Sequence, residues 1–323
     1  MKIKHMITTI DTHTEGGPTR IITSGVGPLA GKTMAEKKDY FGEHFEDVRE
    51  LLMKEPRGHA GMFGAVLTEP VNAGAELGVF FLTGAGYLDM CVHSAMGVAA
   101  AALETGMIPA GRKSIKLDTP AGVISLAANY EGDRLASITI RGNPAYVHSL
   151  KAEVDIGLAR PAIMSLVFSA VFFVLLDAKQ WQIEVRQENI PALTDRAVKV
   201  LEKVNQTLEF AHPENPEIKT AQLAMLYEDR DDACACNAVI SQGGVLDRSP
   251  CGAGTGAKMA YLFARKKLKL KEQYVSKGVF GTQFTGQLIE TVSVGQYAGV
   301  VGEITGSAYI TGFHQFIRDE FDK

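Results

Sequence analysis

The sequence predicts an α+β fold built from two similar halves. Many short runs have the alternating, β-branched pattern of strands, and only a few stretches have the periodicity of helices. Two of the predicted helices directly follow a cysteine, Cys91 or Cys251, and these cysteines stand 160 positions apart in a chain of 323 residues. This spacing predicts two structural halves, each delivering one thiol to a shared cleft.

The first half alternates strands with helical stretches. Residues 5–23 predict two strands around a turn at 15–18, and residues 34–53 predict a helix that ends before Pro56. The alanine-rich segment after Cys91 predicts a helix that stops at Gly106. The remaining short apolar runs predict strands at 63–68, 77–83, 114–117, 122–127 and 137–141. Residues 144–150 are expected to cross over to the second half.

The second half begins near the longest apolar run, Ala162 to Leu176. Its 15 residues fall short of the roughly 20 that span a bilayer, and its Val and Phe content favours a buried strand at 165–176. The helix after Cys251 is expected to end in the basic cluster 265–267. Further expected elements are a helix at 192–210, a loop at 211–220, strands at 221–227 and 236–240, and short glycine-separated strands as far as Gly312.

Composition narrows the class of protein. A net charge of −4 and a pI near 6.1 show no excess of the positive charge that nucleic-acid-binding proteins usually carry, so nucleic acid is not an expected partner. Four cysteines without regular spacing do not predict a secreted disulfide framework. The first residues enter a strand-like run without a signal-peptide pattern, and no run predicts a membrane span. A cytoplasmic location is therefore expected, where reactive thiols persist.

Each cysteine that precedes a helix combines a thiol with an anion site. A thiol at a helix N-terminus lies at the positive end of the helix dipole, which lowers its pKa. The first backbone N–H groups of the same helix can bind a carboxylate or phosphate. Cys91 and Cys251 are therefore the candidate reactive residues.

Other motifs have weaker signals. Cys234 and Cys236 are separated by one residue, which is poor spacing for zinc ligands. Cys91 and His93 have the spacing of a nucleophile pair, but this spacing is common by chance. A phosphate loop at 25–33 fails because Val26 stands where the motif requires glycine. A redox pair is disfavoured because no C-x-x-C turn is present.

Two thiols without such a turn suit acid–base chemistry on a carbon acid. Inversion of a stereocentre requires removal of a proton from one face and return of a proton to the other. Two groups of the same kind, one as thiolate and one as thiol, can do this symmetrically. Two helix N-termini would bind the substrate carboxylate and stabilise the charge that develops as the α-proton leaves.

The sequence resembles the proline racemase family, which also includes hydroxyproline 2-epimerases and trans-3-hydroxyproline dehydratases. The resemblance covers nearly the whole chain, and its cysteine motifs are highly specific together. The motifs that carry it are IDTHTEG at 10–16, EPRGH at 55–59, MCVH at 90–93, LDTPAG at 117–122, DRSPCG at 247–252 and EITGSA at 303–308.

The resemblance implies a fold and a set of site residues. The fold would be two α/β halves of the diaminopimelate epimerase type, each with strands wrapped around a central helix and with the active site between them. The halves would be residues 1–145, completed by strands at 303–323, and residues 146–302. Cys91 and Cys251 would be the two proton carriers, and Asp247 would contact the ring nitrogen of the substrate. Backbone N–H groups would hold the substrate carboxylate at Val92, His93, Gly252 and Ala253.

The expected function is a cofactor-independent, metal-free racemase or epimerase that inverts the α-carbon of proline or a hydroxyproline. Its expected ligand is a small cyclic amino acid, and a homodimer is left open. The alternatives are a trans-3-hydroxyproline dehydratase and a catalytically silent amino-acid-binding paralogue. The family's dehydratases usually carry threonine at the second cysteine, so Cys251 favours the epimerase branch.

Several positions depart from the usual residues of the family, including Leu223 in place of a polar residue and Ser241 in place of an aromatic one. Val92 replaces a glycine, Ala253 replaces a threonine, and Ser169-Ala170 replaces a pair of glycines. Valine does not tolerate the dihedral angles that glycine does, so Val92 raises the question of whether its N–H keeps its direction. Val92 and Ala253 therefore give weight to the silent paralogue.

Overall fold

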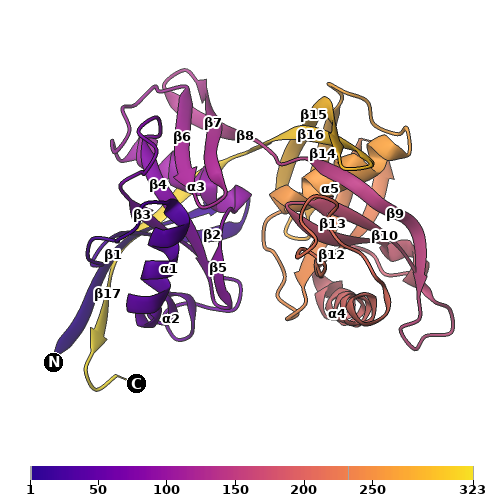
Figure 1. Ribbon diagram of the computed structural model, residues 1–323, viewed down its shortest axis with the longest axis horizontal. Coiled ribbons are helices and arrows are strands. Elements are labelled where there is room, and N and C mark those ends of the chain that lie inside the picture. Colours follow the sequence, from indigo (N-terminus) through magenta and orange to yellow (C-terminus); the bar gives the residue numbers. More distant parts are fainter. Residues whose placement is uncertain (1, 232, 323) are drawn as a thin grey trace. The chain divides into compact units, whose positions relative to one another are not determined.

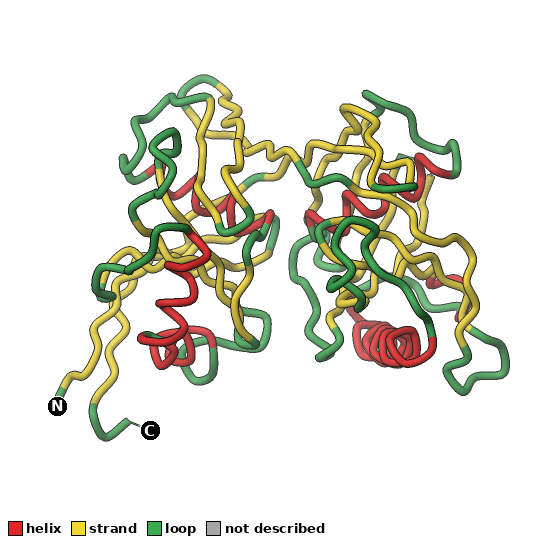
Figure 2. Tube along the Cα trace, viewed as in Figure 1, coloured by secondary structure: helices red, strands yellow, loops and turns green. Residues whose placement is uncertain are grey.

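The computed structural model describes residues 2–231 and 233–322. Its chain forms two compact units, Met1–Ile140 with Gly306–Lys323, and Arg141–Thr305. The mixed α/β class expected from the sequence is confirmed, and strands outweigh helices in both units (Figure 2). That residues 1–145 with 303–323, and residues 146–302, are separate domains stays a prediction. The likeness to diaminopimelate epimerase also stays one.

The first unit is built on strands in the order β17-β1-β2-β3-β4-β6-β7-β8, with the short strand β5 paired to β4. Strands β1 and β17 pair antiparallel along their length, so the two chain ends run side by side (Figure 1). The strands are β1 (Ile3–Thr14), β2 (Gly17–Ser24), β3 (Phe63–Thr68), β4 (Leu77–Thr83), β5 (Gly86–Leu88), β6 (Ser114–Thr119), β7 (Gly122–Glu131), β8 (Arg134–Arg141) and β17 (Ala308–Asp319).

Helix α3 (Val92–Glu104) is the buried helix of this unit and packs against β1, β2 and β17. Its residues 93–103 are all buried, which suits its run of small alanines. A Cβ atom at Gly97 would lie 2.6 Å from Oγ1 of Thr12, so this close approach requires glycine. The helix ends at the C-cap Thr105, followed by Gly106 at φ 76°, which confirms the predicted stop.

The structure confirms that residues 34–53 are helical, but they form two helices rather than one. Helix α1 (Met34–His44) ends and α2 (Glu46–Met53) begins at Phe45, whose backbone leaves the helical region at φ −133° and ψ 23°. Two acidic residues, Glu46 and Asp47, stand in the first turn of α2, where they favour a new N-terminus. The break was not predictable from the hydrophobic pattern, because apolar residues of both helices pack into the same core with β3 and β4.

The second unit is a closed barrel of eight strands. Each strand from β9 to β16 pairs with the next along the chain, and β16 returns to β9 through Gly299 and Tyr146. Closure leaves none of these strands as an edge of the sheet. The strands are β9 (Ala145–Val154), β10 (Ala162–Ser169), β11 (Val171–Asp177), β12 (Ala221–Asp231), β13 (Cys234–Ser241), β14 (Gln273–Gly278), β15 (Gln283–Val294) and β16 (Tyr297–Gly306).

Helix α5 (Gly252–Ala264) packs against β9, β10, β11 and β15 of this barrel, and most of its residues are buried (Figure 1). Gly286 and Gly302 make room for it, since a Cβ atom on them would lie 2.6 Å and 2.7 Å from atoms of Met259. The helix ends at the C-cap Arg265, as its basic cluster predicted.

Two predictions in this unit are wrong. The expected crossover at 144–150 lies mostly in strand β9, whose pairing with both β10 and β16 closes the barrel. The expected strand at 165–176 is two antiparallel strands joined at Ala170, which turns the chain at φ 64°. Ala170 belongs to the Ser169-Ala170 pair that replaces two glycines, so alanine here adopts a conformation that usually favours glycine.

Helix α4 (Ile190–Thr207) packs on β12 and β13, and two short 3-10 turns precede it, η1 (Ala178–Trp181) and η2 (Gln187–Asn189). Its buried stripe confirms the predicted amphipathic helix, and consists of Leu193, Ala197, Val200, Leu201 and Val204. No helix within the described part of the chain is both long and apolar enough to span a membrane.

Candidate active site

The N-terminus of α3 presents the first cysteine. Cys91 is the N-cap residue, with an extended backbone at φ −147° and ψ 117°, and its side chain is half-buried. Val92 and His93 follow as the first two helical residues, whose N–H groups have no acceptor within a helix. The thiol therefore stands beside two backbone donors at the positive end of a buried helix.

His93 is held close to the thiol. Its Nδ1 lies 3.6 Å from Sγ of Cys91, and only 3% of the residue is exposed. The imidazole and the Phe63 ring are nearly perpendicular, at a centroid distance of 4.5 Å. The Thr14 hydroxyl donates a 2.7 Å hydrogen bond to the His93 carbonyl, which ties the first turn of α3 to β1.

This environment changes the pKa of Cys91. Burial raises the pKa of the thiol, but His93 and then the hydroxyl and backbone of Ser94 outweigh burial, so the pKa of Cys91 falls below its usual value. A lower pKa increases the fraction of thiolate near neutral pH. This direction of change favours the thiolate form that a base for an α-proton requires.

The N-terminus of α5 presents the second cysteine in a different backbone conformation. Cys251 is the N-cap residue at φ 64° and ψ 110°, and only 6% of it is exposed. Its Sγ accepts a hydrogen bond from the Gly254 N–H at 3.3 Å. A Cβ atom at Gly254 would lie 3.2 Å from both Cβ and Sγ of Cys251, so glycine lets this helix turn approach the sulfur.

Asp247 lies near Cys251 through the intervening Ser249. The Ser249 N–H and hydroxyl both donate to Oδ1 of Asp247, at 2.9 Å and 2.8 Å. The Cys251 N–H donates to the Ser249 hydroxyl at 3.1 Å. The carboxylate and the thiol-bearing residue are therefore joined by one buried hydroxyl.

The seven predicted site residues fall into two groups. Cys91, Val92 and His93 lie at the N-terminus of α3, and the other group lies at or just before the N-terminus of α5: Asp247, Cys251, Gly252 and Ala253. Each group combines a thiol with helix N–H donors, which suits proton transfer at the α-carbon of a bound carboxylic acid.

Sequence reasoning missed the residues that support these groups. Thr14 and Ser94 act at Cys91, and Ser249 and Gly254 act at Cys251. The only available signals were the alternation of Asp247, Ser249 and Cys251 and a small residue three positions after each cysteine.

The remaining cysteines lie elsewhere. Cys234 and Cys236 are on strand β13 and not at the N-terminus of a helix. Among residues 2–231 and 233–322, no group of three or more His, Cys, Asp or Glu side chains is arranged to hold a metal ion.

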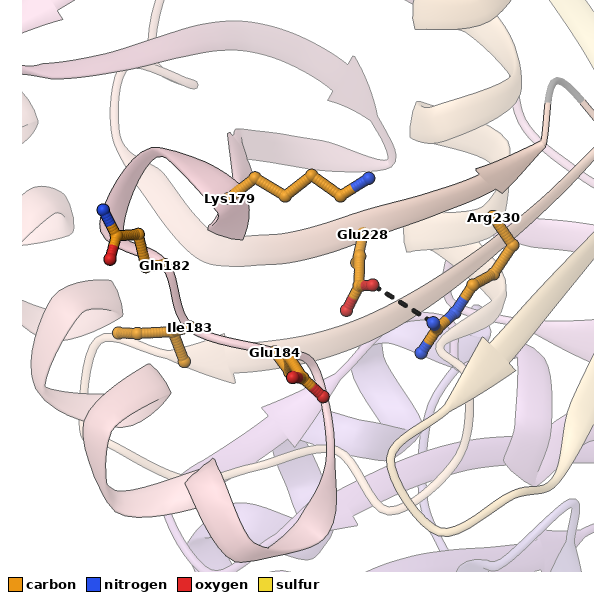
Figure 3. Close-up of a pocket in the computed structure, with 6 residues that line it drawn as sticks. All are labelled: Lys179, Gln182, Ile183, Glu184, Glu228 and Arg230. Carbon is orange, nitrogen blue, oxygen red and sulfur yellow. Dashed lines mark ion pairs between the residues drawn. The ribbon is translucent and has the colours of Figure 1, made fainter.

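A hollow of about 460 Å³ in the second unit contains neither predicted proton carrier (Figure 3). Its lining includes Glu228, whose carboxylate pairs with Arg230 at 3.2 Å and accepts the Val185 N–H. Because Glu228 and Arg230 already pair with each other, this hollow is a weaker candidate for a ligand site than the two helix N-termini.

Comparison with known proteins decides the family. The family model described as proline racemase matches residues 9–323. The chain belongs to the proline racemase family. It is 37% identical to the proline racemase of Clostridioides difficile over 326 residues, covering 100% of this chain and 97% of that protein. It is 34% identical to the trans-3-hydroxy-L-proline dehydratase of Bacillus cereus over 326 residues, with the same coverage.

A solved structure of the family has a similar fold. The hydroxyproline epimerase from Agrobacterium vitis, with bound trans-4-hydroxy-L-proline, is 26% identical with a TM-score of 0.87. The match covers 100% of this chain and 95% of that one.

The chain departs from the usual family residues at Val92 and Ala253, and both positions lie in regular helix. Any L-residue adopts this conformation, so both positions keep a helical N–H.

Proposed function

We propose that the chain is a racemase or epimerase that inverts the α-carbon of proline or a hydroxyproline with two thiols. The observation that carries the proposal is that each unit caps its buried helix with a cysteine, Cys91 in one and Cys251 in the other. The relatives named proline racemase and hydroxyproline epimerase support the substrate class.

In the proposed reaction, one sulfur is a thiolate and the other a thiol. The thiolate takes the α-proton, and the carbon–hydrogen electron pair passes into the substrate carboxylate as an enediolate-like charge. The second thiol then returns a proton to the opposite face. The reverse direction uses the same two groups with their protonation states exchanged, so the reaction requires both sulfurs to reach one α-carbon.

The backbone and Asp247 orient the substrate in this proposal. The N–H groups of the first helical residues bind the substrate carboxylate and stabilise its growing charge: Val92, His93, Gly252 and Ala253. The Asp247 carboxylate, fixed through Oδ1 by Ser249, contacts the ring nitrogen. We further propose that this chemistry uses no cofactor and takes place in the cytoplasm.

Dehydration of trans-3-hydroxyproline is the second candidate, because a relative with this name is 34% identical. It would use one thiol to remove the α-proton and would expel the 3-hydroxyl as water. The family's dehydratases usually carry threonine at the second cysteine, so Cys251 favours inversion. A silent binding paralogue would bind the amino acid without exchanging its α-proton.

One experiment separates these functions. Wild-type protein is incubated in deuterated buffer with L-proline, D-proline and the hydroxyproline isomers, and products are followed by NMR and chiral chromatography. The proposal expects deuterium at the α-carbon together with the opposite stereoisomer. A pyrroline product would indicate dehydration, and thermal stabilisation by ligand without exchange would indicate a binding protein.

A further inference from the structure

Asp247, Ser249 and Cys251 alternate along a segment that leads into α5. The Asp247 N–H donates to the Val239 carbonyl at 2.9 Å, which fixes the start of this segment to β13. Ser249 is only 2% exposed, and its hydroxyl lies between the other two residues. One buried side chain therefore contacts both the predicted proton carrier and the carboxylate predicted to bind the ring nitrogen.

The Ser249 hydroxyl uses its single donor and one of its two acceptor sites in these contacts. It has one proton, which it donates to Oδ1 of Asp247 at 2.8 Å, and it accepts the Cys251 N–H at 3.1 Å. Pro250 stands between Ser249 and Cys251 and has no N–H to offer. The Cys251 N–H is thus the first backbone donor after Ser249.

The hydrogen bond from the Cys251 N–H to the Ser249 hydroxyl forms at a residue with an unusual backbone conformation. Its φ of 64° lies in the left-handed region, which residues other than glycine rarely adopt, whereas Cys91 is extended at φ −147°. In this conformation Sγ of Cys251 accepts the Gly254 N–H at 3.3 Å. Loss of the Ser249 hydroxyl would remove one of the bonds that hold the conformation, and with it the alignment of the sulfur.

We propose that Ser249 is a positioning residue that fixes the Cys251 sulfur and the Asp247 carboxylate together. It sets the sulfur against the Gly254 N–H while it holds one oxygen of the carboxylate, so that thiol and carboxylate are oriented as one unit. The roles given to Cys251 and Asp247 rest on the proposed function, but the structural coupling between them does not.

The test compares Ser249→Ala with the wild type, the conservative variant Ser249→Thr and a matched control, Ser276→Ala. Ser276 is a fully buried serine of the same unit whose hydroxyl accepts a 2.7 Å hydrogen bond from Asn237. Both alanine variants lose one buried hydroxyl, and only Ser249→Ala loses the link to Cys251. Alkylation by iodoacetamide is followed against pH, and each cysteine is quantified by peptide mass spectrometry.

Ser249→Ala is expected to raise the midpoint pH of Cys251 alkylation by about one unit, which is about a tenfold lower thiolate fraction at neutral pH. Cys91 in the same digest, and Cys251 in Ser276→Ala, should keep the wild-type midpoint, and Ser249→Thr should restore it. An unchanged midpoint in Ser249→Ala, an equal shift in Ser276→Ala, or no recovery with threonine would each overturn the proposal.

Amide exchange and steady-state kinetics test the same proposal independently of alkylation. Amide exchange of the wild type, measured by NMR, needs no variant: the Cys251 N–H should be protected relative to those of Gly252 and Ala253, and equally fast exchange would overturn the bond to Ser249. Kinetics with the amino acid should show a higher KM and a lower kcat in Ser249→Ala than in Ser276→Ala. Because alkylation requires no turnover, failure of the protein to racemise would reject the proposed function and leave the coupling through Ser249 testable.

Discussion

The Nζ atom of Lys258 lies 2.7 Å from Oδ1 of Asp229 inside the second unit. The Lys258 side chain is fully buried, and its ammonium sits 3.0 Å from the centroid of the Tyr227 ring. Burial lowers the pKa of Lys258 to about 8, although Asp229 acts in the opposite direction. Since Lys258 belongs to α5, this ion pair joins the helix that presents Cys251 to strand β12.

Replacing Asp229 should destabilise the protein more than replacing Lys258. Asp229→Asn leaves a buried ammonium without its counter-charge, which we expect to cost the lower end of about 3–5 kcal/mol. The lower end applies because the Asp229 side chain is 34% exposed and solvent screens it. Lys258→Met should cost less, because the Asp229 carboxylate that it leaves without a counter-charge is partly exposed and remains hydrated. Urea denaturation at neutral pH measures both, and a larger loss in Lys258→Met would contradict the expectation.

The same lysine predicts a pH dependence of stability. The unfolded chain holds the Lys258 proton up to its ordinary pKa of about 10.4, whereas the folded chain releases it near the lowered pKa of about 8. Between these values the unfolded state binds more protons, so this group makes the free energy of unfolding rise with pH. Urea titrations across this window should show that rise in the wild type and a smaller one in Lys258→Met. Equal slopes would place the titration elsewhere.

Replacement of either proposed proton carrier should abolish racemisation. Cys91→Ser and Cys251→Ser each remove one of two required acid–base groups, so we expect losses of at least about 10²-fold in turnover. Cys234→Ser and Cys236→Ser are matched controls, because these cysteines lie on β13 and should leave turnover unchanged. Polarimetry with L-proline or the best hydroxyproline measures the effect. Turnover retained by either of the first two variants would reject the two-thiol assignment.

His93→Phe should make Cys91 less acidic. His93 is the leading contributor that lowers the pKa of the thiol, and without it the opposing effect of burial is offset by Ser94 alone. The midpoint pH of Cys91 alkylation should therefore move upward, so less thiolate is present near neutral pH. Cys251 in the same sample is the internal reference, and His148→Phe, which alters strand β9, is the matched variant. A midpoint that stays in place would show that His93 does not tune this thiol.

Gly254→Ala should reduce turnover beyond its effect on stability. Its Cβ atom would meet the Met225 Cε at 2.6 Å and the sulfur of Cys251 at 3.2 Å. Gly286→Ala is the control, since its Cβ atom would meet the Met259 Sδ at 2.6 Å, away from the thiol. Both should lose about 1–3 kcal/mol of stability. Only Gly254→Ala should lose up to about 10²-fold in kcat through displacement of the sulfur. Equal kcat values in the two variants would contradict this reasoning.

The local signals of the sequence were sufficient for the capped helices. Alanines after Cys91, a glycine at 106 and basic residues at 265–267 act through contacts within a turn or two, so α3 and α5 began and ended as predicted. The strands that required distant partners were less predictable. Residues 145–154 form a strand because β10 and β16 pair with them. Their own composition did not indicate this pairing.

The sequence by itself determined the family, the two cysteine-capped helices and the seven candidate site residues, because motifs and capping patterns are local. Only the tertiary structure decided what surrounds those residues. Thr14 reaches the carbonyl of His93 from 79 positions away, and Lys258 of α5 pairs with Asp229 of β12. The left-handed backbone of Cys251 occurs in a segment that hydrogen bonds anchor to β13 and to Ser249. Such contacts depend on which strands pair, and strand pairing is set by the whole chain rather than by any short stretch of it.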